Sequence, residues 1–231
     1  MKILGVLPLA GSGVRLGADF HKALMPFPTQ DKLSFQAIVR FSIQRLEMVS
    51  DEIVAVVSPD SQHSFPVEKF NLTALIKSAQ GEAPSSIQLA AEYAFDHGFS
   101  HIAVSLPDTF WEPLDGFSLL VEHIQQNKEL GVDGALGLFN GDPTMLDRVS
   151  MSEDNIVKAI STRGNLGEPS QKSIGWGCFV LATSKAITFD DSMSWAENLM
   201  QARLTALQLS STYIDIGSPQ RYLSGLKELL D

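Results

Sequence analysis

The stretch Leu7-Pro-Leu-Ala-Gly-Ser-Gly-Val-Arg-Leu-Gly17 starts inside an apolar run, residues 3–9, that is typical of a buried strand. Small residues at positions 11–13 follow this run directly, so backbone N–H groups can close around phosphate oxygens. Arg15 and Lys22 add two positive charges, and an arginine can hold a phosphate through two parallel hydrogen bonds. A strand, a small-residue turn and two cations together predict a cradle for a nucleoside triphosphate.

Two common glycine-rich loops fit this stretch poorly. The dinucleotide fingerprint needs G-x-G-x-x-G leading into a helix, with an acid about 20 residues later. Here Gly17 falls one place late, and residues 35–43 form a helical pattern without an acid. The Walker loop needs Gly-Lys-Ser/Thr, whereas Ala18 and Asp19 follow Gly17. An ordinary glycine-rich turn between a strand and a helix stays open as the alternative.

Composition limits the class of protein. The chain has 231 residues, an ordinary apolar fraction of 44% and a formal net charge of −10. This charge argues against a nucleic-acid or anionic-membrane surface, which needs a basic face, but it leaves small anions open. A single cysteine, Cys178, excludes an internal disulfide and is typical of a reducing compartment. Without a signal-peptide pattern or an apolar run of about 20 residues, we expect a cytoplasmic protein.

Strand-like and helix-like patterns alternate along the chain, which predicts parallel pairing with right-handed crossovers. We expect one domain over residues 1–231, with an α/β fold: a Rossmann-like, mixed and mostly parallel sheet flanked by helices. We divide it into a nucleotide-binding half, residues 1–113, and a half that binds a second substrate, residues 114–231. The expected strands are 3–9, 52–57, 72–77, 101–106, 132–139, 148–151, 156–161, 174–181 and 212–216. The expected helices are 33–46, 86–95, 114–126, 195–209 and 220–230.

The first loop resembles a family signature, approximately A-G-x-G-x-R-L followed by Lys and an apolar-Pro step, which residues 10–16 and 22–26 match. This is the signature of the sugar-1-phosphate nucleotidyltransferases, a group that includes thymidylyl-, uridylyl- and cytidylyltransferases. The resemblance implies that Arg15 holds the leaving phosphates and that Lys22 bridges the α-phosphate and the incoming phosphate. It also implies a set of nucleotide-binding residues: Leu9, Ala10, Gly11, Ser12, Gly13, Gln80 and Ser85.

Two carboxylates fit the same family pattern. Asp108 follows the strand at 101–106, and ligands of doubly wound sheets lie beyond the carboxyl ends of the strands. If the first and fourth strands are neighbours, Asp108 faces the phosphate loop as an oxygen ligand for Mg²⁺. Asp215 lies in a step that resembles the family's late D-x-G-S-P motif, whose aspartate completes the metal site. A turn or helix cap is the alternative role for each residue.

Weaker matches concern the nucleobase and the second substrate. Gln80 resembles the residue that reads a pyrimidine edge, although Ser85 stands where the family has glycine. Gly175 and Gly177 resemble the small-residue strand beside the sugar. The family's lysine in a Glu-Lys-Pro step is missing, and we expect His21 to be a simple loop residue. Three cations are candidate replacements for the lysine: Lys158, Arg163 and Lys172.

The resemblance implies an Mg²⁺-dependent condensation of a nucleoside triphosphate with a sugar 1-phosphate, which gives a nucleotide sugar and pyrophosphate. The phosphate nucleophile is already anionic, so the reaction needs positioning and charge neutralisation rather than a protein base. One alternative is a cytidylyl- or guanylyltransferase for a non-sugar phosphate. Another is a nucleotide-binding regulatory relative without turnover. The implied partners are the two substrates, and a homo-oligomer stays open.

Overall fold

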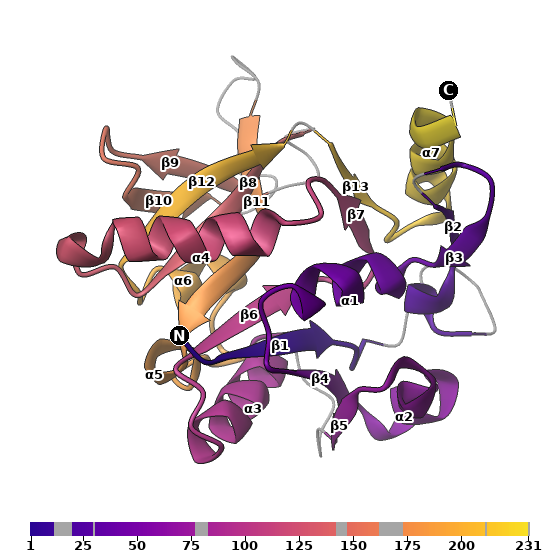
Figure 1. Cartoon of the computed structure of the whole chain (residues 1–231), viewed down its shortest axis with the longest axis horizontal. Coiled ribbons are helices and arrows are strands. Elements are labelled where there is room, and N and C mark those ends of the chain that lie inside the picture. Colours follow the sequence, from indigo (N-terminus) through magenta and orange to yellow (C-terminus); the bar gives the residue numbers. More distant parts are fainter. Residues whose placement is uncertain are drawn as a thin grey trace.

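The computed structural model describes residues 1–11, 20–29, 31–76, 83–141, 147–161, 173–210 and 212–230. Its centre is a nine-stranded sheet in which β1 (Ile3–Pro8) lies between β4 (Glu52–Val57) and β6 (His101–Ser105), all parallel. The edge strand β5 (Thr73–Ile76) continues the parallel part. Figure 1 shows these strands side by side, with β7 and β13 at the end of the molecule to which β6 points.

The second half of the chain extends the same sheet. β11 (Ser173–Ala182) pairs antiparallel with β6 and also with β8 (Gly134–Gly141), and β12 (Leu204–Ser210) pairs parallel with β8. The hairpin of β9 (Arg148–Met151) and β10 (Val157–Ser161) completes the sheet. Two small sheets stand apart from it: β13 (Tyr213–Asp215) with β7 (Thr109–Trp111), and β2 (Pro26–Pro28) with β3 (Phe35–Ala37).

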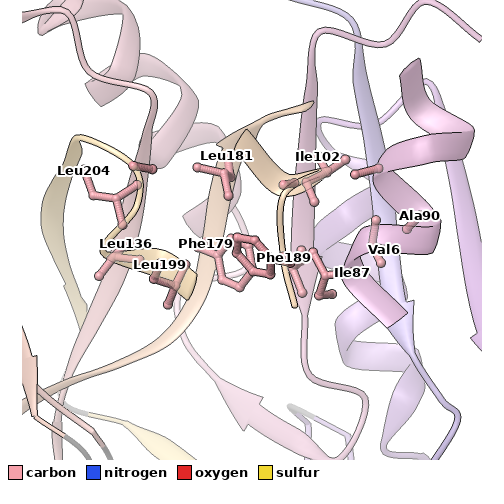
Figure 2. Packing of buried hydrophobic residues seen from close by; sticks show 14 of the residues in the cluster. Val6, Ile87, Ala90, Ile102, Leu136, Phe179, Leu181, Phe189, Leu199 and Leu204 are labelled. Carbon is pink, nitrogen blue, oxygen red and sulfur yellow. The ribbon is translucent and has the colours of Figure 1, made fainter. Parts of the chain in front are cut away.

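Helices cover both faces of the main sheet. One face packs against α3 (Ala83–Asp96), α5 (Thr183–Ala186) and α6 (Trp195–Leu199) in the core cluster of Figure 2. The other face packs against α1 (Val39–Glu47) and α4 (Gly116–Gln126) in a second cluster. Because side chains alternate along a strand, Leu4 and Val6 of β1 enter the first cluster while Ile3 and Leu7 enter the second. Burial on both faces explains the unbroken apolar runs of β1 and β4.

The remaining helices are short or terminal. α2 (Pro59–Ser64) begins with a capping box, and α7 (Pro219–Leu230) closes the described chain beside β13 and β2. Single turns of 3₁₀ helix occupy Lys22–Leu24, Val67–Phe70 and Lys128–Leu130. Among the described helices, none combines the length and the apolar character needed to cross a membrane.

The expected fold class is confirmed, and two predicted helices are wrong in part. The helix predicted over residues 33–46 begins only at Val39, because residues 35–37 form β3 and pair with β2. The pattern over residues 195–209 predicts a single helix, but α6 ends at Leu199 and residues 204–210 form β12. Leu204 and Ala206 enter the first core cluster, whereas Leu207 and Leu209 pack against the second. Apolar residues on both faces hide the period of two, so the segment imitates a helix in the sequence.

Candidate active site

The carboxyl ends of β1 and β6 lie side by side, because the two strands are paired in parallel from Ile3–His101 to Val6–Val104. Asp108 follows β6 and is mostly buried, and Lys22 lies beyond the loop that follows β1. The Lys22 ammonium donates a hydrogen bond to Asp108 Oδ2, which makes an ion pair. The structure thus brings together two of the residues that the sequence predicts, from positions 86 apart.

The phosphate loop itself is described only in part. Leu9 is buried, and its N–H donates to the Val56 carbonyl at 2.8 Å, which extends the pairing of β1 with β4 by one residue. Ala10 is half-buried and Gly11 is exposed. A Cβ added at Gly11 would meet nothing within 4 Å, so the backbone there is open to a ligand. The other predicted loop and base-reading residues lie outside the described residues: Ser12, Gly13, Arg15 and Gln80.

His21 has a larger role than the simple loop residue expected from the sequence. Its side chain is buried, with Nδ1 accepting from the Ala23 N–H at 3.2 Å. Nδ1 must therefore lack a proton, and Nε2–H donates to the Leu9 carbonyl at 3.1 Å. Burial lowers the pKa of His21, which favours this neutral form. The ring joins the end of β1 to the turn that carries Lys22.

Helix α1 holds the turn that carries Asp108. Ser42 Oγ donates to the Leu106 carbonyl at 2.9 Å, and Thr109 Oγ1 donates to the same carbonyl at 2.9 Å. One turn further along the helix, Arg45 donates to the Trp111 carbonyl and lies over the Trp111 ring at 4.3 Å. Burial lowers the pKa of Arg45 to about 10, so it stays charged at neutral pH. These contacts fix the backbone on both sides of the carboxylate.

The backbone around Asp215 is hydrogen-bonded to the backbone around Asp108, although the two residues are far apart in the sequence. Asp215 pairs with Thr109 between β13 and β7, and the Ile216 N–H donates to the Asp108 carbonyl at 3.1 Å. The Asp215 carboxylate accepts from the Gly217 N–H at 2.7 Å and from Arg221 Nη1 at 2.8 Å. Asp215 therefore lies on β13 and Asp108 lies immediately before its partner strand β7, and each carboxylate has a cationic partner.

The donor set is compatible with Mg²⁺ at a phosphate. The described residues contain no group of three or more His, Cys, Asp or Glu side chains that could hold a metal by themselves. Mg²⁺ usually binds through one or two carboxylates together with substrate phosphates and waters. Asp108 and Asp215 supply two carboxylates, and Asp108 Oδ1 accepts no hydrogen bond from the described residues. Two carboxylates with a phosphate are the donors that Mg²⁺ uses, and a metal shared by Asp108 and Asp215 stays a prediction.

Three other predicted site residues lie within the described part of the chain. Ser85 lies in the first turn of α3, where its N–H donates to Asp191 Oδ1 at 2.8 Å. Gly175 pairs with Phe139 of β8, and Gly177 lies against the ring of Tyr213. A Cβ at Gly177 would lie 2.2 Å from Tyr213 Cε2. The missing side chain at this position is therefore needed for packing of β13, and contact with a ligand stays a prediction.

No family model matches this sequence, and no curated protein matches it. Solved structures do match. A Bacillus anthracis protein assigned as a glucose-1-phosphate thymidylyltransferase, in complex with sucrose, has a TM-score of 0.76 at 13% identity, covering 100% of this chain and 96% of that one. The chain has the fold of the nucleotidyltransferases. The inositol-1-phosphate CTP transferase from T. maritima has a TM-score of 0.71 at 18% identity, covering 99% and 95%. The CMP:2-keto-3-deoxy-manno-octonic acid synthetase in complex with CTP has a TM-score of 0.73 at 12% identity, covering 100% and 98%.

The sequence does not reveal two of the contacts in this nucleotidyltransferase fold. Histidine at position 21 belongs to no periodic pattern, so its two backbone partners emerge only when β1 and the following turn are placed together. Arg221 lies six residues after Asp215 and looks like an ordinary surface residue of the closing helix. A signal for Arg221 does exist, since Pro219 starts the helix and brings position 221 into its first turn, close to the preceding strand.

Proposed function

We propose that this protein is a nucleotidyltransferase that joins a nucleoside triphosphate to a phosphorylated sugar, with release of pyrophosphate and with Mg²⁺ as cofactor. The observation that carries the proposal is the Lys22–Asp108 ion pair at the carboxyl ends of β1 and β6. It joins a cation to a metal-type ligand at the edge of the sheet where β1 ends, and the open backbone of Gly11 follows that strand. The fold shared with enzymes named for nucleotidyl transfer supports the same reaction class.

In this mechanism an oxygen of the incoming phosphate attacks the α-phosphorus, and the bond between the α-phosphorus and the bridging oxygen of the pyrophosphate breaks. The nucleophile is already an anion, so no side chain needs to remove a proton. Lys22 stabilises the negative charge that gathers on the α-phosphate, while the backbone at residues 9–11 orients the triphosphate. When bound, Mg²⁺ on Asp108 and Asp215 would neutralise phosphate oxygens.

The contacts around Lys22 favour a preorganised site. Asp108 holds the ammonium in place, His21 fixes the turn on which it stands, and α1 fixes the turn that carries Asp108. A cation whose position is set before the substrate arrives needs little reorganisation during the reaction. The pair is partly open to solvent, with side-chain exposures of 25% for Lys22 and 12% for Asp108, so a phosphate can reach it.

A second candidate is transfer to a phosphate that is not on a sugar. Structural neighbours are named for inositol 1-phosphate and for 2-keto-3-deoxy-manno-octonic acid, so the shared fold accommodates several nucleophiles. The late step at residues 215–219 favours the sugar branch, because it resembles the motif of that group.

The deciding experiment is a screen for pyrophosphate release. The protein is mixed with each nucleoside triphosphate, a panel of phosphorylated sugars and non-sugar acceptors, and Mg²⁺. We expect one combination to release pyrophosphate, and excess chelator to abolish the release. In the Asp108→Asn variant we expect the Mg²⁺ concentration for half-maximal rate to rise. Full activity in chelator would contradict the metal role. If no combination of substrates released pyrophosphate, a non-catalytic nucleotide-binding protein would be favoured.

A further inference from the structure

Arg148 lies in line with β6, beyond the end that carries Asp108. β8 pairs with β11 from Ser173–Gly141 to Leu181–Gly134 and so occupies one whole edge of β11. The other edge is shared: β6 pairs with Cys178 to Ala182, and β9 pairs through Gly175 with Arg148. Gly175 lies three residues beyond Cys178, the last residue of β11 that pairs with β6. Along this edge of β11, β9 therefore begins where β6 has ended.

Side chains alternate between the two faces of the main sheet along β9, and this alternation determines the face on which Arg148 lies. Val149 and Met151 pack against the cluster that contains Trp176, so residue 148 lies on the opposite face of the sheet. Side chains of directly paired residues share a face, and Gly175 also pairs with Phe139 of the second cluster.

The guanidinium of Arg148 has no partner in the described part of the chain. Its Nε and Nη2 atoms are buried and make no hydrogen bond, and its charge is in no ion pair there. The other two site cations differ, because Lys22 is paired with Asp108 and Arg221 with Asp215. The residue as a whole is half-buried. Buried N–H groups without an acceptor are unfavourable, so two of them on one guanidinium are typical of a site completed by an anion.

We propose that Arg148 binds the phosphate of the second substrate, in place of the missing lysine of the family's Glu-Lys-Pro step. The planar guanidinium can hold two phosphate oxygens at once. Arg148 stands on the second half of the chain, past the strand end that carries Asp108, which suits an acceptor approaching the nucleotide. The assignment of this phosphate to an acceptor substrate rests on the proposed function. The binding of a phosphate by Arg148 does not depend on it.

The other candidate cations fit less well. The side chain of Lys158 is exposed on β10, the strand next to β9, and it lies in the bulge between Val157 and Ala159. Arg163 and Lys172 lie outside the described residues. Lys158 therefore serves as the matched comparison: it carries the same charge on the neighbouring strand of the same sheet, without burial.

The test measures binding directly by isothermal titration with inorganic phosphate and with glucose 1-phosphate as probes. The proteins are the wild type, Arg148→Gln, Arg148→Lys and Lys158→Gln. We expect Arg148→Gln to weaken both probes by about tenfold to a hundredfold, the loss of a charged hydrogen-bonded contact. Arg148→Lys keeps the charge and loses the two-oxygen grip, so an intermediate affinity is expected. Lys158→Gln should stay within about twofold of the wild type.

Nucleotide titrations test whether Arg148 binds the nucleotide instead of the phosphate of the second substrate. In calcium, which prevents turnover, Arg148→Gln should bind the nucleoside triphosphate as the wild type does. An equal loss of nucleotide affinity would place Arg148 on the nucleotide and overturn the inference. Unchanged probe binding in Arg148→Gln, a larger loss in Lys158→Gln, or no probe binding by the wild type would overturn it too. If Arg148→Gln does not fold, as judged by circular dichroism, Arg148→Lys alone decides: wild-type affinity for the probes overturns the inference.

The outcome is distinguishable from failure of the proposed function. Probe binding that depends on Arg148, together with no pyrophosphate release from any substrate pair, would reject the enzyme and keep the phosphate site. Pyrophosphate release with an acceptor affinity that is independent of Arg148 would keep the enzyme and reject the site. In an active wild type, the inference also predicts that Arg148→Lys raises KM for the acceptor and leaves KM for the nucleotide unchanged.

Discussion

Lys22 and Asp108 form the contact on which the proposed chemistry depends. We expect Lys22→Met to lower kcat for pyrophosphate release by about a hundredfold to a thousandfold, because one preorganised donor at a developing charge is lost. The melting temperature should change little, since a partly exposed ion pair stabilises the fold by about 1 kcal/mol or less. Steady-state kinetics and a thermal melt check both points, with Lys22→Arg as the control that keeps the charge. Near-native turnover in a folded Lys22→Met protein would remove Lys22 from the mechanism.

His21 makes the same loop sensitive to acid. Burial lowers its pKa below the ordinary value of 6.5, so below that pH the unfolded chain binds a proton that the folded chain resists. The stabilisation is complete above pH 6.5 and is lost as the pH falls through and below that value. Protonation would also set a donor against the Ala23 N–H. We therefore expect the free energy of unfolding to fall between about pH 7.5 and about pH 5.5.

The His21→Asn variant isolates this contribution, because its amide oxygen can still accept from the Ala23 N–H while no longer titrating. Burial also lowers the pKa of His101 and His123, so the variant should keep part of the pH dependence. Urea unfolding of both proteins at the two pH values gives the comparison. An equal loss of stability in wild type and variant would show that His21 does not contribute to it.

At the level of the elements, β11 and β13 meet at one glycine. Because a Cβ at Gly177 would overlap the Tyr213 ring, we expect Gly177→Ala to destabilise the fold by about 1–3 kcal/mol through overpacking. It should also reduce activity, since Asp215 stands two residues after Tyr213 on the displaced strand. Gly11→Ala is the matched control, because its added Cβ meets nothing within 4 Å. Equal melting temperatures for the two variants would contradict this account.

Most elements could be predicted from the sequence because their patterns are local. The runs at 52–57 and 101–105 are apolar and short, and both form buried parallel strands. For the segment 195–209 the local pattern predicts the wrong structure. Residues 204–210 form a strand because they pair with β8, and not because of their local preference. Asp108 could be found from its place after a strand. Its partner contacts could not, because they depend on pairing between distant strands.

Arg148 illustrates the limit most clearly. In the sequence it is one basic residue at the start of a short strand, and Lys158, Arg163 and Lys172 carry the same charge. What distinguishes it is a single pair with Gly175, which depends on β9 taking the place of β6 along β11. A cation's partner or lack of one is a property of the fold, so spacing along the chain cannot identify it.

On the scale of the whole molecule, the two halves share one core. β6 of the first half pairs with β11 of the second, and Ile102 and Val104 lie in the same cluster as Phe179 and Leu181. Figure 2 shows several of these side chains, from strands and helices of both halves, packed against one another. Cutting the chain near residue 113 would expose the β6 edge and this apolar surface to water, at a cost of roughly 25 cal/mol for each Å².

We therefore expect a fragment of residues 1–113 not to fold by itself, whereas the full chain unfolds in one transition. The fragment should lack a sigmoidal urea transition and should bind a hydrophobic dye, because the surface that β11 covers is left open. For the full chain, far-ultraviolet and near-ultraviolet circular dichroism should give coincident unfolding curves. A cooperative transition in the isolated fragment, matched by a separate phase in the full chain, would show two domains instead. The nucleotide cradle would then be independent of the half that carries Arg148.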